Sequence, residues 1–376
     1  MIFLLGEAWG EHEAKIGKPF VGPTGVELLK ILHKAQILTL NPSDYTSINS
    51  FYRTNDPTYI HSIWSRFSYI HRTNVFNLHP PGNDLKYLCG TKAQGIPGYP
   101  PLEKSSYARA EFTPELNRLA DEIRTHDPNC IVCLGNTALW ALTGSTGIGT
   151  ARGYTSISSH TAIGWKFLPT YHPTTIFHQY SLRPIVIADL MKAKAQSEFP
   201  ELRRPQREIW IEPTLEDVRE FIYMYIERSE VTEENIGYPW QSNLLSVDIE
   251  TYGSRVTCIG FSPSPDLALV IPFEPGLNSE KSYWPTPESE TLVWKWIRSV
   301  LENASIPKLF QNGLYDIAFL WRSMHIQVRG AMHDSMLLHH ALQPEMNKGL
   351  GFLGSLYSDE HMWKGMRKHE TIKRDD

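Results

Sequence analysis

The stretch IFLLGEAWGEHEAKIGKPFVGPTGVELLKILHKAQI (residues 2–37) decides the fold of the first half of the chain. It begins with an apolar run typical of a buried strand, passes through a glycine-rich segment, and ends with apolar residues at helical spacing. Short apolar strands and amphipathic helices continue to alternate as far as about residue 199. This alternation predicts a mostly parallel sheet covered on both faces by helices. We therefore expect an α/β fold, with a three-layer α/β/α domain over residues 1–204.

A second domain is predicted after a charged, proline-punctuated segment at 205–240, which we interpret as a linker with one helix. The domain at 241–376 begins with three strands in succession, followed by a helix. The sequences of these elements are LLSVDIET (244–251), VTCIGFSP (256–263), LALVIPF (267–273) and TLVWKWIRSVLEN (291–303). Their order resembles the ribonuclease H-like fold of exonucleases.

Composition sets broad limits on what the chain does. Its 376 residues, 41% of them hydrophobic, suffice for two cores, and the formal net charge of -5 excludes a uniformly basic DNA-coating protein. No apolar run reaches transmembrane length, so we expect a cytoplasmic protein without a membrane partner. Four cysteines are too few and too scattered for a secreted disulfide framework, which fits a reducing compartment.

Three motifs stand out in the first domain: GEAWGEHEAKIGKPFVGPTGVELL (6–29), TNVFNLHPPGN (73–83) and LPTYHPTTIF (168–177). They resemble the motifs of family 4 uracil-DNA glycosylases and occur in that family's order. Each is predicted at the carboxyl end of a strand, where open sheets place their ligands. The resemblance implies an enzyme that extrudes uracil from DNA, holds it in a tight pocket and stabilises the departing uracil anion.

By this resemblance, Gly6 lets the backbone approach the sugar and phosphates. Glu7 and Glu13 occupy acidic positions of the first motif, where either positions water or balances positive charge on the sugar. Ala8 stands at the family's small residue instead of a catalytic aspartate, so electrostatic stabilisation should outweigh general base catalysis. Phe20 matches the stacking aromatic, whose ring offers a base about 1–3 kcal/mol.

The later motifs supply the groups that would read the base. Asn74 matches the amide that pairs with the imide edge of uracil, Asn83 is a further substrate contact, and His172 matches the donor to the developing anion. Taken singly, an asparagine at a strand end or a lone histidine is more often structural. Their joint occurrence in family order favours the functional interpretation.

Three further positions bear on substrate contact. Ile176 or Phe177 is a candidate wedge into the minor groove, with Arg183 near phosphate. Trp9 departs from the family, which usually has proline there; its indole would narrow the pocket or change which damaged base fits.

Family 4 glycosylases generally hold an iron–sulfur cluster with four cysteines, two of them ahead of the first motif. Here only MIFLL precedes that motif, so an iron–sulfur cluster is not expected. Cys130 and Cys133 form a CxxC pair, but the apolar strand CIVCL favours two buried thiols over a metal or redox pair.

In the second domain, Asp248 and Glu250 lie two residues apart in a run that reads as a buried strand, so both carboxylates project to the same side. KLFQNGLYDIAFL (308–320) adds Asn312, Tyr315 and Asp316. Together they resemble the first two motifs of the 3'-5' exonuclease domain of family A DNA polymerases. The resemblance implies Mg²⁺ or Mn²⁺ held by Asp248, Glu250 and Asp316, and substrate contacts from Asn312 and Tyr315.

The third exonuclease motif, a tyrosine followed four residues later by an aspartate, has no match before the sequence ends, so this domain is incomplete. The order of domains resembles the N-terminal part of certain phage DNA polymerases. That implies DNA as a partner and a polymerase domain in the same or a neighbouring chain. Three functions stay open: uracil excision, which leads; a metal-dependent exonuclease whose front domain only senses uracil; and a non-catalytic DNA-binding module of a replication complex.

Overall fold

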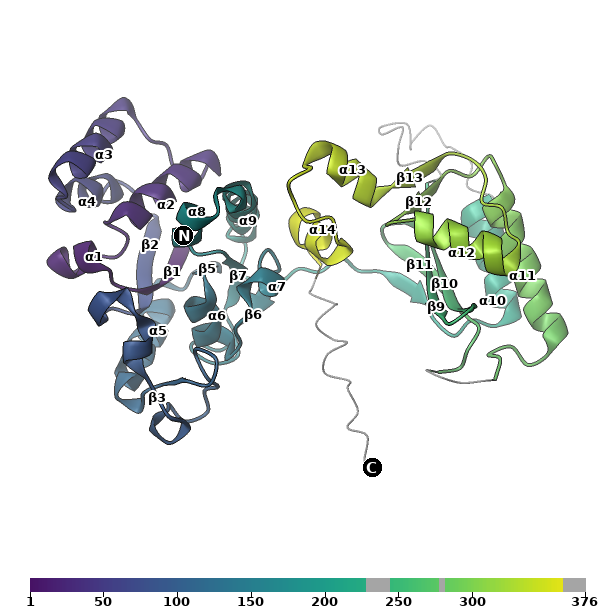
Figure 1. Cartoon of the computed structure of the whole chain (residues 1–376), viewed down its shortest axis with the longest axis horizontal. Coiled ribbons are helices and arrows are strands. Elements are labelled where there is room, and N and C mark those ends of the chain that lie inside the picture. The colour runs from purple at the N-terminus through teal and green to yellow at the C-terminus, as the bar shows by residue number, and fades with distance from the viewer. Residues whose placement is uncertain (228–243, 277–280, 361–376) are drawn as a thin grey trace. The chain divides into compact units, whose positions relative to one another are not determined.

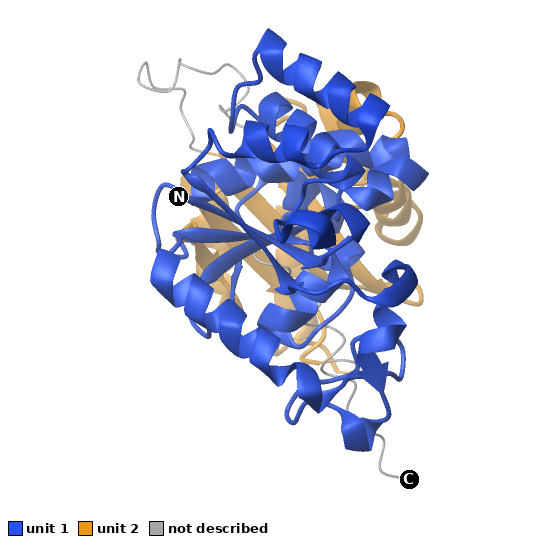
Figure 2. Cartoon of the chain, turned by 90° about the vertical axis from the view of Figure 1, so that its left-hand side faces the viewer, with its two compact units in different colours: residues 1–204, 351–376 blue, residues 205–350 orange. Residues whose placement is uncertain are grey.

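The computed structural model describes residues 1–227, 244–276 and 281–360. The chain forms two compact units, coloured separately in Figure 2. Of the described residues, unit 1 contains 1–204 and 351–360, and unit 2 contains those between 205 and 350. The prediction that the third exonuclease motif is missing lies in part outside the described residues, because positions 361–376 are not described.

Unit 1 is built on a five-stranded sheet in the order β2-β1-β5-β7-β6. The first four strands are parallel, and the short edge strand β6 runs antiparallel to β7. The register places Gly6 of β1 beside Asn74 of β2, so two of the predicted site residues are neighbours across the sheet. The strands are β1 (Ile2–Ala8), β2 (Ile70–Phe76), β5 (Cys130–Leu134), β6 (Ser156–Ile157) and β7 (Lys166–Thr170).

Helices cover both faces of this sheet, which confirms the three-layer α/β/α prediction (Figure 1). On one face α2 (Pro23–Lys34) and α9 (Arg183–Gln196) share an apolar core with Leu4 and Val132. On the other, α5 (Thr113–His126) and α6 (Asn136–Thr143) pack with Phe3 and Ile131, because adjacent strand residues point to opposite faces. The shorter helices of unit 1 are α1 (Glu11–Ile16), α3 (Pro42–Thr54), α4 (Thr58–Trp64), α7 (Ile148–Ala151), α8 (Thr174–His178) and, after unit 2, α14 (Leu350–Tyr357).

Unit 2 has a six-stranded sheet in the order β13-β12-β9-β10-β11-β8. Its centre is an antiparallel meander, flanked by β12 running parallel to β9. This is the ribonuclease H-like arrangement that the strand order predicted. The elements are β8 (Glu208–Trp210), α10 (Leu215–Phe221), a π-helical segment (Ile222–Glu227), β9 (Leu245–Tyr252), β10 (Arg255–Ser264), β11 (Leu267–Pro272), α11 (Pro287–Glu302), β12 (Lys308–Phe310), α12 (Leu314–Met324), β13 (Met332–Asp334) and α13 (Ser335–Leu342).

The segment interpreted as a linker differs from that expectation. Residues 208–210 form β8, which pairs in parallel with β11, and α10 packs into the core of unit 2 through Val218 and Phe221. The described part of 205–240 therefore belongs to the second unit. The stretch interpreted as exonuclease domain also differs at its far end, because the described residues 351–360 group with unit 1.

Within the described ranges, none of the helices combines the length and the apolar character that crossing a membrane would require.

Candidate functional site

A cavity of about 470 Å³ opens at the carboxyl ends of β1, β2 and β7 in unit 1. Parallel strands end on the same edge of a sheet, so three separate motifs meet there. Of the residues predicted from the sequence, those that line the cavity are Glu7, Ala8, Trp9, Glu13, Phe20, Asn74, Asn83 and His172. The glycine-rich segment and the loop after β2 contribute the rest of the wall, including Gly10, Gly22, Pro80 and Leu85.

Gly6 allows two of these side chains to converge. A methyl group at this position would lie 2.2 Å from Asn74 Oδ1 and 2.5 Å from Phe20 Cζ, well inside contact distance. The predicted role for Gly6 was close approach of the backbone to DNA. The structure instead shows that its missing side chain makes room for the carboxamide and the aromatic ring.

Phe20 is held in a conformation that a bulky residue rarely adopts. Its φ of 56° lies in the left-handed region, its carbonyl accepts a hydrogen bond of 2.8 Å from Trp64 Nε1, and Gly25 packs against its backbone. The ring lies 6.3 Å, centroid to centroid, from the ring of His172, at an angle of 32°. Backbone strain of this kind persists where the surroundings fix it, so Phe20 is a preset wall of the cavity.

Asn74 is buried, with 2% of its surface exposed. Its backbone is fixed, because its carbonyl accepts from Arg118 Nη2 at 2.8 Å and its N–H donates to Asn77 Oδ1 at 3.3 Å. Among the residues that the structure describes, no hydrogen-bond partner is found for the Asn74 carboxamide. A buried amide with one acceptor and two donors left for a ligand is suited to reading a polar edge.

His172 follows β7 and is oriented by Thr174. Nδ1 accepts from the Thr174 N–H at 3.4 Å and lies 2.8 Å from Thr174 Oγ1. The proton of the neutral ring is therefore placed on Nε2, which makes that nitrogen a donor. Burial lowers the pKa of His172 from 6.5, against the opposing charges of Glu7 and Glu13, so the imidazole is neutral at pH 7.

The two glutamates have different surroundings. Glu13 is buried, and its carboxylate accepts three backbone hydrogen bonds: from Val21 and Gly22 at 2.9 Å each, and from Gly10 at 3.2 Å. Its oxygens are thus occupied in holding the glycine-rich segment together, which suits a positioning role better than the catalytic one predicted. Glu7 accepts one hydrogen bond from Thr137 Oγ1 at 2.7 Å and faces the cavity.

Trp9 and Asn83 complete the predicted wall. The indole N–H of Trp9 is buried and has no hydrogen-bond partner within the described residues. Asn83 has a φ of 58°, and its Oδ1 lies 3.1 Å from His79 Nε2. Both side chains therefore reach the cavity from loops rather than from strands.

The predicted DNA wedge needs a correction. Ile176 is 3% exposed and packs in the apolar core of unit 1, so it cannot insert into DNA. Its neighbour Phe177 is 55% exposed and is the better candidate. Arg183 is partly buried and donates from Nε to Glu27 at 2.6 Å, so contact with phosphate stays a prediction for its remaining N–H groups.

Sequence reasoning missed the residues that orient this site. Thr137 binds Glu7 across 130 positions of sequence, and Trp64 binds the carbonyl of Phe20 across 44. Neither pair leaves a local pattern. Thr174 was detectable in principle, because a hydroxyl two residues after a histidine can bond its ring nitrogen.

Cys130 and Cys133 are both buried, as predicted. They project to opposite faces of the sheet, since Cys130 belongs to the core with α2 and α9 and Cys133 to the core with α5 and α6. Burial raises the pKa of Cys130 to about 12. These two thiols therefore cannot share one metal.

In unit 2, β9 positions the first two predicted carboxylates. Asp248 and Glu250 project from the same side, as expected, but they are exposed, while Val247 and Ile249 fill the core. The strand is therefore buried on one face and not on both, which corrects the argument that its carboxylates are buried. Asp316, on α12, is 5% exposed and accepts a hydrogen bond of 3.1 Å from Ile249 N–H, between the other two residues.

Burial raises the pKa of Asp316, and the nearby charges of Asp334 and Glu250 raise it further. Carboxylate oxygens are suitable ligands for Mg²⁺ or Mn²⁺. In the described parts of the chain, however, no three His, Cys, Asp or Glu side chains converge as a metal site. In this arrangement the predicted trio therefore does not form a metal site, and one oxygen of Asp316 accepts a hydrogen bond from the backbone of β9.

The other residues of this region have structural partners. Tyr315 Oη lies 2.6 Å from Thr251 Oγ1, which ties α12 to β9. Asn312 has a φ of 63° and donates its backbone N–H to Asp334 Oδ1 at 3.2 Å. Asp334 also accepts from Gly313 and Met336, so it caps two elements at once.

Comparison with known proteins identifies the class of each unit. Residues 1–195 match the family model of the uracil DNA glycosylase superfamily, which is more than half of the 376 residues, and the chain belongs to that superfamily. Residues 223–374 match the family model described as 3'-5' exonuclease. The chain thus joins a glycosylase-type domain to an exonuclease-type domain.

Two curated relatives match this combination of domains. A DNA polymerase of Bacillus phage SP01 is 25% identical over 277 residues, which are 69% of this chain and 28% of the polymerase. A type-4 uracil-DNA glycosylase of Thermotoga maritima is 27% identical over 200 residues, 52% of this chain and 76% of that protein. The chain therefore spans only a little over a quarter of the phage polymerase.

Similar solved structures include Brucella melitensis NrnC with bound Mg²⁺, at 20% identity, 32% of this chain, 55% of that chain and a TM-score of 0.24. The Aedes aegypti Nibbler EXO domain has 17% identity over 36% of this chain and 67% of its own, with a TM-score of 0.26.

Proposed function

We propose that unit 1 is a uracil-DNA glycosylase-like hydrolase that excises a flipped uracil from DNA, in replication or repair. The observation that carries this proposal is the convergence of Phe20, Asn74 and His172 in one cavity. A cavity with a stacking ring, an unsatisfied carboxamide and a neutral imidazole donor has the groups that an extruded pyrimidine needs.

Each residue has a task in this proposal. Uracil stacks on Phe20, and the Asn74 carboxamide pairs with the N3–H and O4 of the base. Cytosine would leave those amide groups unpaired and so be rejected. As the C1'–N1 bond breaks, negative charge moves onto the base, and His172 Nε2–H donates to its O2 oxygen.

Water must then add to C1' of the sugar. Glu7 lies in the cavity wall with its carboxylate oriented by Thr137, so it is placed to balance positive charge on the sugar or to orient the water. Glu13 acts through the segment that it holds. Because Ala8 offers no carboxylate, the main contribution to the rate is electrostatic stabilisation of a dissociative transition state.

The direct test is release of free uracil from single-stranded and mismatched DNA by the purified chain. Asn74→Ala should lose most of this release, a fall of about a hundredfold or more, because one buried donor aimed at the substrate is removed. Asn117→Ala is the matched control, since Asn117 is exposed on α5 and does not line the cavity. Undiminished release by Asn74→Ala would remove the pocket assignment.

A second candidate function is metal-dependent 3'-5' exonuclease activity of unit 2, with unit 1 sensing uracil. It is favoured by the exonuclease family match and by Asp316 binding β9 between Asp248 and Glu250. Metal binding would require the three carboxylates to come closer together, with Asp316 using the oxygen that does not accept from Ile249. DNA is the proposed partner of both units, with a polymerase domain in the same or a neighbouring chain. Uracil-specific binding without base release or degradation would instead indicate a non-catalytic module.

A further inference from the structure

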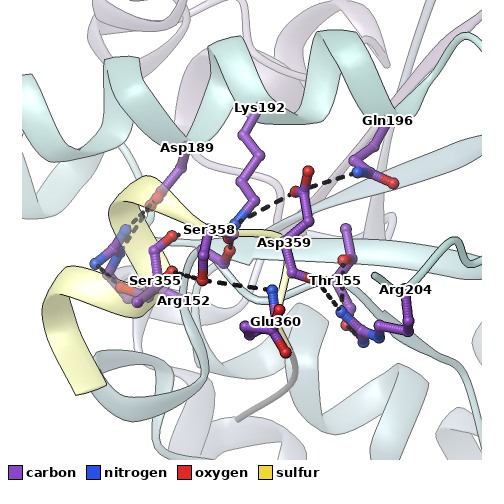
Figure 3. Close-up of polar contacts among 12 residues, drawn as sticks. Arg152, Thr155, Asp189, Lys192, Gln196, Arg204, Ser355, Ser358, Asp359 and Glu360 are labelled. Atoms are coloured by element: carbon purple, nitrogen blue, oxygen red, sulfur yellow. Dashed lines mark hydrogen bonds and ion pairs between the residues drawn. The ribbon is translucent and has the colours of Figure 1, made fainter. Parts of the chain in front are cut away.

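The chain returns to unit 1 after it has formed unit 2. We name residues 351–359 the returning segment; it contains most of α14 and the two residues that follow. Figure 3 shows that it meets side chains of α9 and of the turn after α7. The segment lies within residues 223–374, which match the exonuclease family model, but in the structure it packs in unit 1, the glycosylase-type unit.

The centre of the contact is an ion pair between Arg152 and Asp189, each 1% exposed. Arg152 Nε donates to Asp189 Oδ2 at 2.9 Å, and Nη2 donates to Oδ1, so the pair is bidentate. The returning segment binds the remaining side of the guanidinium. Arg152 Nη1 donates to Ser355 Oγ at 2.8 Å, and the guanidinium lies 5.1 Å from the ring centroid of Phe352.

Lysine and arginine side chains of unit 1 hold the end of α14. Lys192 Nζ donates to the carbonyls of Gly153 at 2.8 Å, Ser355 at 3.3 Å and Ser358. A cation at the carboxyl end of a helix satisfies carbonyls that have no partner within the helix. Arg204 Nη1 donates to the Asp359 carbonyl at 2.6 Å, which fixes the last residue of the segment.

The same ion pair is connected by hydrogen bonds to the end of β7, the strand that precedes His172. Asp189 Oδ2 accepts a hydrogen bond of 2.7 Å from Thr170 Oγ1. Thr170 is buried and is the last residue of β7, two positions before His172. The N–H of Gly153, beside Arg152, donates to the Pro169 carbonyl at 2.9 Å. Both the carboxylate and the turn that carries the arginine therefore bind the strand end that leads to His172.

We propose that the returning segment positions His172 for base release, through Ser355, Arg152, Asp189 and Thr170 in turn. The segment fixes the guanidinium, the guanidinium fixes the carboxylate, and the carboxylate fixes the end of β7. This inference rests on the proposed glycosylase function of unit 1. It makes Thr170, Asp189 and Arg152 positioning residues, because none of them lines the cavity.

The test uses the full chain with substitutions that leave the buried ion pair in place. Thr170→Val removes the hydroxyl at nearly constant volume, and we expect single-turnover uracil release to fall about tenfold, since small displacements of a catalytic group are costly. The dissociation constant for uracil-containing DNA should stay within twofold. Thr170→Ser, which restores the hydroxyl, should restore the rate.

Ser355→Ala tests the segment itself and should lower the rate in the same direction. Ser358→Ala is its matched control, because the Ser358 hydroxyl, like that of Ser355, donates to a carbonyl of α14 but does not bind Arg152, and Lys192 binds the Ser358 backbone carbonyl. If Thr170→Val and Ser355→Ala release uracil at the rate of the unaltered chain, the positioning role is wrong.

A second readout separates this proposal from the proposed function. In the full chain labelled with ¹⁵N-histidine, Thr170→Val and Ser355→Ala should shift the His172 ring signals, and Ser358→Ala should not. His172→Gln identifies those signals. If the unaltered chain releases no uracil, the glycosylase function fails, and the shifts still report the positioning. Unchanged His172 signals in both variants would overturn the positioning even in an active enzyme.

Discussion

Gly6 shows how much of the proposed site depends on one absent side chain. Asn74 and Phe20 come from a neighbouring strand and from a loop, and they meet over the glycine. The space that a methyl group would occupy is already filled by the carboxamide oxygen and the ring. The geometry of the proposed base pocket therefore depends on Gly6, which does not itself line the cavity.

Gly6→Ala should reduce uracil release at least about a hundredfold, because the new Cβ lies within 2.5 Å of both side chains and must displace them. The measurement is single-turnover base release, with circular dichroism to show that the chain is folded. Gly149→Ala is the control, since the nearest atom to its Cβ would be Tyr171 Oη at an ordinary 3.6 Å. Full activity in Gly6→Ala would contradict the packing described for the site.

His172 gives a pH dependence with a definite sign. Burial places its pKa in the folded protein below 6.5, so the ring is mostly neutral at pH 7 and becomes protonated in more acidic solution. Single-turnover release should therefore stay nearly constant between pH 8 and 7, and its change with the protonation of His172 should have its midpoint below pH 6.5. The profile of His172→Gln serves as the comparison. An inflection at or above pH 6.5 that is absent from His172→Gln would show that the imidazole is not held neutral.

For individual residues, the sequence predicted the positions that belong to local motifs. Phe20 lies in the glycine-rich segment, Asn74 lies near the end of β2 and His172 follows β7, and the structure brings the three together. It could not decide between Ile176 and Phe177, because adjacent residues of a helical turn face differently and the burying surface comes from distant elements. The run LLSVDIETYG was interpreted as a buried strand, although its alternation of apolar and charged residues already indicates one buried face and one exposed face.

The glycine-rich segment between β1 and α2 behaves as one element, with Glu13 at its centre. Three backbone N–H groups converge on this carboxylate and close the segment over the cavity. The buried carboxylate of Glu13 thus stabilises the conformation of the segment, and its hydrogen bonds compensate for its burial.

Glu13→Gln replaces one acceptor oxygen with a donor, so at least one of the three hydrogen bonds is lost. We expect local stability to fall by about 1–3 kcal/mol, which native-state hydrogen exchange at the Val21 and Gly22 amides would measure. The same substitution should also weaken the binding of uracil-containing DNA. Glu11→Gln is the control, because Glu11 is exposed and pairs with Lys15 on the surface of α1. Equal protection of these amides in the two variants would contradict the holding role.

The order of elements was largely predictable, because strand–helix alternation is a strong periodic signal. The strand β8 and the position of α14 could not be predicted. The strand β8 has three residues and no periodicity, and only its pairing with β11 reveals it. The position of α14 depends on contacts with residues about 150 to 200 positions earlier, which no local pattern contains.

For the whole molecule, the two proposed chemistries should respond differently to metal removal. Uracil release needs no metal in the arrangement proposed for unit 1, so it should survive a chelator. Degradation from a 3' end, if unit 2 performs it, should stop and return with Mg²⁺ or Mn²⁺. Both reactions can be followed on one labelled DNA that contains uracil.

Substitutions should separate the units in the same assay. Asp248→Ala should abolish degradation and spare uracil release, whereas Asn74→Ala should do the opposite. Asp266→Ala, at an exposed turn between β10 and β11, should change neither. Degradation that persists in Asp248→Ala or in chelator would exclude the carboxylates of β9 as its source.

The division of unit 1 into two stretches of sequence has a consequence for biosynthesis. A ribosome finishes residues 1–204 well before it reaches Ser355, and at about 5–20 residues per second the delay is on the order of ten seconds. During that interval Arg152 and Asp189 exist without the turn of helix that covers them in the finished protein. Residues 1–204 can therefore complete the contacts of unit 1 only after the returning segment has been synthesised.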